Sequence, residues 1–154
     1  MYPQGSLTTP GTLEALVSRL ESVRPDSARQ WGRMTPSQML CHLSDSFLTV
    51  TGQRPIAKHA ETFFTRTVIK YVAIHSPLPW PKGVPTMKEV DAEQEGTRPG
   101  EFERDRQRTI ELMRAFAAPD ASCVRHPIFG EMSRAEWMKW GFGHVDHHLR
   151  QFGC

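Results

Sequence analysis

The residues most able to carry chemistry are histidines crowded into the segment WGFGHVDHHLRQFG, residues 140–153. It holds three of the chain's seven histidines, and two of them, His144 and His148, are four residues apart. This spacing places both imidazoles on one face of a helix, whereas His147 turns to the side. Two buried imidazoles without partners would each cost about 1–3 kcal/mol. The alternative is a pair of surface histidines, or of core histidines hydrogen-bonded to carbonyls, but the pattern predicts that His144 and His148 share one metal ion.

A third ligand is required, and His42 is the candidate because it lies on the inward edge of another predicted helix, residues 35–52. Three histidines and an open position are typical of catalytic zinc-type sites, whereas structural sites usually have four protein ligands. Imidazoles suit several metals, so we expect a divalent ion, zinc or nickel first and iron, manganese or copper next. Neither the HExxH protease motif, in which Val145 would be Glu, nor a PCxxC deaminase motif is present.

The other histidines and one cysteine are predicted to have no ligand role. His59, His75 and His126 fall in loop-like or helix-edge positions. Cys41 points away from the neighbouring His42 around the same helix, because successive residues are separated by about 100°. The predicted ligand set is thus restricted to three imidazoles.

Polar residues beside the ligands are candidates for supporting roles. Asp45 follows His42 by three residues, and Asp146 lies between the other two ligands. Either carboxylate can orient a ligating imidazole or act as a base, the alternative being a solvated surface charge. Arg150 is a candidate for holding an anionic substrate group, the alternative being an exposed arginine at a helix end.

Five predicted helices must position these residues, and two of them begin with clear signals. Thr35, Pro36 at the first helical position and Gln38 form a capping box for residues 35–52. Ser133 and Glu136 form a second one at the start of the last helix.

The other predicted helices cover residues 12–25, with Thr12 as the N-cap, and residues 100–118. Residues 61–74 favour a shorter fifth helix, although their β-branched side chains leave a strand open. Gly141 lies on the ligand face of the last helix, where the missing side chain can leave space for a pocket at about 1 kcal/mol of helix propensity. These elements predict an all-α, four-helix bundle.

Residues 75–100 have a different composition. The stretch HSPLPWPKGVPT contains four prolines and Trp80, so it can form neither a helix interior nor a central strand. A connection of this length is either functional or a plain surface segment. We expect Trp80 to line a ligand-binding cleft.

Length and composition point to one domain, residues 1–154, rather than two. The net charge of +2 comes from interspersed acids and bases, which does not favour nucleic-acid binding. No apolar run is long enough for a membrane span, and no signal peptide is recognisable. Three widely spaced cysteines do not suggest a disulfide framework, so a reduced, cytoplasmic protein is expected.

Two segments, MTPSQMLCHLSDS with His42 and HVDHHLRQFG with His144 and His148, resemble the DinB-like superfamily, which includes thiol transferases of the bacillithiol type. Gln151 keeps the family's final spacing, but Arg150 is displaced by one and no glycine precedes Gln151, which indicates a divergent branch. The segments PWPKG, HPIFGEMS and DHHLRQFG together resemble an uncharacterised DinB-related family. The resemblance implies a four-helix bundle with a divalent metal on three histidines, often as a homodimer.

Two functional hypotheses follow. The first is a metal-dependent enzyme acting on a small molecule, either a thiol S-transferase with a low-molecular-weight thiol as co-substrate or a hydrolase. The second is a non-catalytic domain for metal binding or dimerisation, in which the ion only ties two helices together. A fourth protein ligand would favour the second hypothesis, and a cleft beside the ion would favour the first.

Overall fold

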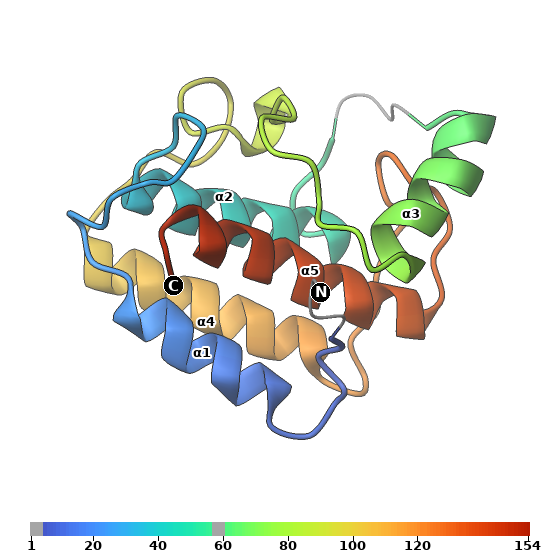
Figure 1. Ribbon diagram of the computed structural model, residues 1–154, viewed down its shortest axis with the longest axis horizontal. Helices are drawn as coiled ribbons and strands as arrows, with labels where there is room; N and C mark the ends of the chain where they lie inside the picture. Colours follow the sequence, from blue (N-terminus) through green and yellow to red (C-terminus); the bar gives the residue numbers. More distant parts are fainter. Residues whose placement is uncertain (1–4, 57–60) are drawn as a thin grey trace.

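The computed structural model describes residues 5–56 and 61–154 (Figure 1). Within these ranges the chain is helical, as predicted, and apart from one isolated bridge between His126 and Gly130 it has no β-pairing. The α-helices are α1 (Thr12–Ser22), α2 (Pro36–Val50), α3 (Lys70–His75), α4 (Phe102–Ala117) and α5 (Arg134–Gln151). A π-helical turn, η1 (Thr65–Ile69), leads into α3, and a 3₁₀ turn, η2 (Lys88–Val90), precedes α4.

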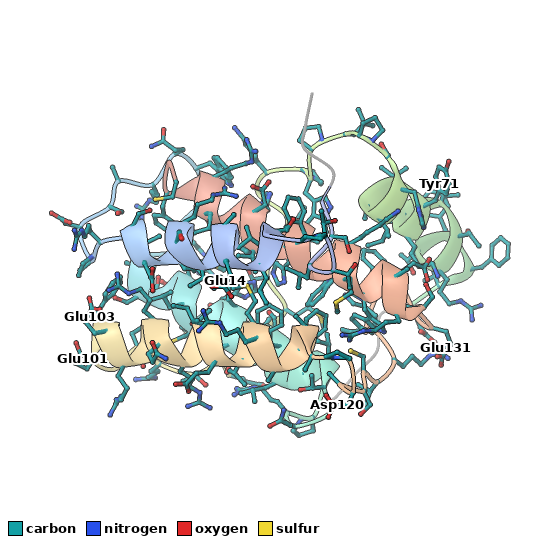
Figure 2. All side chains as sticks on the ribbon, turned by 90° about the horizontal axis from the view of Figure 1, so that it is seen from below. Glu14, Tyr71, Glu101, Glu103, Asp120 and Glu131 are labelled. Carbon is teal, nitrogen blue, oxygen red and sulfur yellow. The ribbon has the colours of Figure 1, made fainter. Side chains whose placement is uncertain are left out.

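The four long helices pack around a common interior. Helix α2 contacts α4 and α5, and α1 contacts the same two helices, so the four form a closed ring of neighbours. Their axes run in roughly the same direction, with α2 and α5 above α1 and α4 in Figure 1. Large side chains from three of these helices meet inside, among them Phe47, Met113, Phe116 and Leu149. Acidic side chains such as Glu14, Glu101 and Glu131 lie on the outside (Figure 2).

The start of each helix follows from local chemistry. The Thr35 side chain accepts from the backbone N–H of Gln38, and the predicted capping box is formed. Ser133 does the same for α5. The prediction for α1 is wrong: Gly11 is the N-cap, with φ 79°, and makes no side-chain cap, while Thr12 is the first helical residue. A glycine adopts this left-handed conformation without the steric penalty that a side chain would bring.

The segment before the Pro-rich stretch is helical rather than extended, so the predicted short helix is confirmed. It consists of η1 and α3, and among the long helices it packs on α5. Several of its apolar side chains face outward, including Phe63, Phe64 and Tyr71, and Figure 2 shows Tyr71 on the outer side of this helix. The β-branched residues of this segment lower its helix propensity. A helix nevertheless forms all its backbone hydrogen bonds within the segment, whereas a strand would need a neighbouring strand for pairing.

The interpretation of Gly141 as a space-maker for a pocket is wrong. A Cβ atom on Gly141 would lie 2.6 Å from the Phe116 ring and 2.8 Å from a methyl group of Leu7. The glycine therefore allows α4 and the N-terminal segment to pack directly against the backbone of α5. Its cost in helix propensity is offset by this close packing.

The Pro-rich segment folds back onto the last helix. The indole N–H of Trp80 donates to the Ala73 carbonyl at 2.8 Å. Its ring lies against α5 at Gly143, where a Cβ atom would be 3.3 Å from the indole. Among the described residues, no helix combines the length and the apolar character that crossing a bilayer requires.

The caps give a matched pair of substitutions for unfolding experiments. Thr35→Ala removes a side chain that satisfies a helix N–H, so we expect a loss of about 1 kcal/mol in the free energy of unfolding. Thr12→Ala removes no cap and should cost less than about 0.5 kcal/mol. Urea denaturation followed by circular dichroism measures both, and equal losses would contradict the assignment of Gly11 as the N-cap.

Candidate metal centre

Three imidazoles converge between α2 and α5. His42 comes from α2, and His144 and His148 come from successive turns of α5. One nitrogen from each ring lies within 4.8 Å of the other two, and the Nε2 atoms of His42 and His144 are 3.0 Å apart. All three side chains are buried. The structure thus brings together the three residues that the sequence predicted as ligands.

Burial keeps these rings in the form that binds metals. It lowers the pKa of His42, and it lowers the pKa of His144 and of His148 well below the usual value for histidine. The rings also disfavour one another's charge, since protonated neighbours repel. A neutral imidazole has a free nitrogen lone pair, which is what coordination requires.

In two of the three rings, those of His42 and His148, a carbonyl oxygen determines which nitrogen keeps its lone pair free. The Nδ1 of His42 lies 2.9 Å from the Val90 carbonyl, and the Nδ1 of His148 lies 3.0 Å from Oε1 of Gln151. A carbonyl can only accept, so both Nδ1 atoms carry the proton. The orientation of the Gln151 amide is set in turn, because its nitrogen donates to the Trp31 carbonyl at 3.0 Å.

The free lone pairs of His42 and His148 are therefore on Nε2. His144 is held by aromatic packing: its ring stacks on Trp80 at 5.9 Å between centroids and contacts Trp140 at 4.9 Å. Its Nδ1 is buried without a hydrogen-bond partner in the described part of the chain. Three nitrogens so arranged fit a single cation, which can accept electron density from all of them at once.

No other candidate ligand joins the group. Among the residues that the structure describes, no fourth histidine, cysteine or carboxylate lies within the same cluster. The Cys41 thiol points to Asp105, with 3.9 Å between Sγ and Oδ2, and burial raises its pKa to about 12. Such a thiol stays protonated and is not a ligand, as the helix geometry predicted.

Asp45 and Asp146 are buried and paired with arginines rather than solvated. Asp45 accepts from the Arg54 guanidinium at 3.0 Å and from the N–H and hydroxyl of Thr97. Asp146 accepts from Arg19 at 2.7 Å and from Arg150 at 2.8 Å. No hydrogen bond joins either carboxylate to a ring of the triad in the described structure; Val90 and Gln151 provide those contacts.

Asp45 nevertheless supports the site at a distance. Its partner Arg54 also donates to the carbonyls of Glu89 and Glu95, at 3.1 and 2.7 Å. These contacts fasten the loop that includes Val90, whose carbonyl orients His42. Sequence reasoning missed this loop because its path depends on contacts between residues far apart in the chain.

Among the described residues, the remaining histidines are not part of the triad. His75 is exposed on α3, with 3.4 Å between its Nε2 and Glu136. His126 is buried, stacks on Phe129 at 4.4 Å, and accepts two backbone N–H groups at Nδ1. His147 contacts Trp31, Trp80 and the ring of His148, and it lies beside the triad without joining it, as predicted. His59 lies outside the described residues.

The predicted substrate-side residues lie next to one another. Trp80 and Arg150 line the same cleft, and Trp80 forms its wall toward His144. The Arg150 guanidinium also bonds to the buried Asp146. The cleft therefore adjoins the triad on the side of the Pro-rich segment.

These observations define a helical protein with a buried centre of three histidines. The chain belongs to a family described as "Protein of unknown function (DUF1569)", which matches residues 5–153. Neither the curated proteins nor the solved structures gave a match to the chain. These comparisons do not show the DinB-like family, which stays a prediction from the sequence motifs.

Metal content tests the centre directly. Purified wild type should carry about one divalent ion per chain, and His148→Ala should lose it, because two imidazoles hold an ion far more weakly than three. His147→Ala is the matched control and should retain the ion. Elemental analysis of folded, desalted protein gives the result, and a metal-free wild type would refute the centre.

The carbonyl that orients His148 can be tested separately. Gln151→Met keeps the length of the side chain but removes the acceptor, so we expect metal affinity to fall about 10–100-fold. Gln107→Met, on the exposed side of α4, should leave it unchanged. Competition with a chromophoric chelator measures both affinities. Equal affinities for wild type and Gln151→Met would show that this hydrogen bond is not needed.

Proposed function

We propose that this chain is a divalent-metal-dependent enzyme of the DinB type, which transfers a small thiol to an electrophilic substrate. The observation that carries the proposal is the convergence of His42, His144 and His148 without a fourth protein ligand among the described residues. A three-histidine site leaves at least one position for an exchangeable group. The ring of packed helices is compatible with a DinB-type four-helix bundle.

The chain's own residues prepare the site for chemistry. Val90 and Gln151 hold the Nδ1 protons of two ligands, so that the Nε2 lone pairs face inward. Trp80 covers His144 and limits access of water from the Pro-rich segment. A divalent ion on these three neutral ligands supplies a Lewis acid that lowers the pKa of a bound thiol or water. Imidazole donors suit zinc, nickel, copper and iron alike, and we propose zinc or nickel first.

The surroundings favour thiol transfer over hydrolysis. A metal-activated hydrolase usually relies on a carboxylate near the attacking water, and the two candidates, Asp45 and Asp146, are both held by arginines. Thiol transfer needs no such base, since a lowered pKa alone yields the nucleophile. The new bond joins sulfur to carbon as the bond from that carbon to the leaving group breaks; the leaving group departs with the electron pair, as chloride from a chloroarene, and the thiol proton goes to solvent.

Other features accompany the proposal. None of the three cysteines forms a disulfide, which fits a reducing compartment such as the cytoplasm. The outward-facing apolar side chains of η1 and α3 are a surface that a second copy can cover in a homodimer. A non-catalytic metal domain is the alternative, but the cleft beside the triad is a feature that a purely structural ion does not require.

Conjugation assays test the enzymatic proposal. Glutathione, bacillithiol and mycothiol are each offered with 1-chloro-2,4-dinitrobenzene to zinc- or nickel-loaded protein and to chelated protein. We expect a rate at least about 100-fold above that of the chelated sample with one thiol, since activating the thiol is the ion's task. His148→Ala should behave like chelated wild type. Identical rates with and without metal would exclude this mechanism.

A further inference from the structure

The cleft beside the triad has a composition of its own. Its volume is about 510 Å³, which is within the range of small-molecule sites. Part of its lining is aromatic or apolar, from Trp31, Pro79 and Trp80. Basic or imidazole side chains of Lys82, His147 and Arg150 line another part, and Gly153 and Cys154 complete it. No acidic side chain lines it among the described residues.

The charges around this cleft do not balance. Asp146 is one buried carboxylate between two guanidiniums, Arg19 and Arg150. Arg19 also donates to the backbone oxygen of Cys154, and a carboxylate there would offset one of those charges. The Lys82 ammonium lies 4.3 Å from the centre of the Trp31 ring and forms no ion pair in the described structure. Among the described residues, the Lys82 ammonium that lines this cleft therefore has no anionic partner.

The aromatic walls are held firmly. The Trp80 indole is fixed by its hydrogen bond to Ala73 and by contact with α5 at Gly143. Trp31 lies against His147 at 5.6 Å and beneath Lys82. Two indoles and a proline offer flat apolar surfaces to the ring of a ligand. The Lys82 ammonium, which lies over Trp31, attracts a negative charge.

We propose that this cleft binds a small organic anion that has a flat apolar ring and a carboxylate, with the ring between the indoles and the carboxylate toward Lys82. Two side chains that line the cleft contact ligands of the triad: Trp80 stacks on His144, and His147 contacts His148 at 5.2 Å. A molecule held there lies one side chain from the centre. The inference rests on the proposed function only in identifying this anion as the substrate; its binding requires no metal.

The choice of anion over cation follows from the same contacts. A cationic ligand could also stack on indoles, but it would meet the charge of Lys82 and the guanidinium side of Arg150 at the same wall. The cleft therefore discriminates by charge at Lys82 and by shape at the indoles.

Paired probes test this inference. 2-Naphthoate and the isosteric, uncharged 2-naphthamide are titrated calorimetrically into chelated wild-type protein. We expect the naphthoate to bind at least about tenfold more tightly, because only it pairs with the ammonium. Lys82→Met should remove most of this preference, and Lys88→Met, which changes an exposed lysine paired with Glu95, should keep it. Equal affinities for the two probes, or an unchanged preference in Lys82→Met, would overturn the proposal.

Indole signals locate the bound probe. In ¹H–¹⁵N spectra of the chelated protein, naphthoate should shift the indole N–H resonances of Trp31 and Trp80 and leave those of the buried Trp137 and Trp140 in place. Shifts confined to the buried pair would place the ligand elsewhere and refute the cleft. Because these measurements contain no metal, their failure is separate from failure of the metal centre or of thiol transfer.

Discussion

The structure depends on one constraint: three imidazoles are buried at a single point with their lone pairs directed inward. Both nitrogens of a buried neutral ring need a partner. Here two of the three rings donate hydrogen bonds from Nδ1 to oxygens of Val90 and Gln151. What remains is a cluster of nitrogen acceptors with few donors, which is unfavourable in an apolar interior. A single cation bound by the three nitrogens would remove that imbalance. The nearest carboxylates, Asp45 and Asp146, are paired with arginines instead.

The rest of the molecule can be understood as support for that constraint. Helices α2 and α5 carry the ligands, and the ring of α1, α4, α2 and α5 fixes their separation. Asp45 and Arg54 fasten the loop behind His42, and Asp146 fastens α5 through Arg19 on α1. Buried ion pairs of this kind add little net stability, but each determines a unique arrangement of the chain. Removing either carboxylate would therefore disturb positions rather than remove a reacting group.

Much of this arrangement could be predicted from the sequence, because it depends on local signals. The capping boxes at Thr35 and Ser133 mark two helix starts, and the spacing of His144 and His148 follows from helix geometry. The rest depends on contacts between distant segments. The role of Gly141 was predicted wrongly because Gly141 packs against Phe116 of α4. Asp45 pairs with Arg54, 9 residues away in the chain, and Asp146 pairs with Arg19, 127 residues away. Periodicity contains no information about such partners.

The cleft beside the triad favours the proposed enzymatic function over the non-catalytic alternative. An ion that only ties helices together has no need of an adjacent cavity, whereas here a cleft of about 510 Å³ lies beside the triad. Here the Pro-rich segment holds Trp80 between the cleft and His144, so the same side chain lines both. Proline rigidity limits the loss of conformational entropy when that loop is ordered. The cleft thus adjoins the three-histidine centre with Trp80 between them, an arrangement that is compatible with the proposed function.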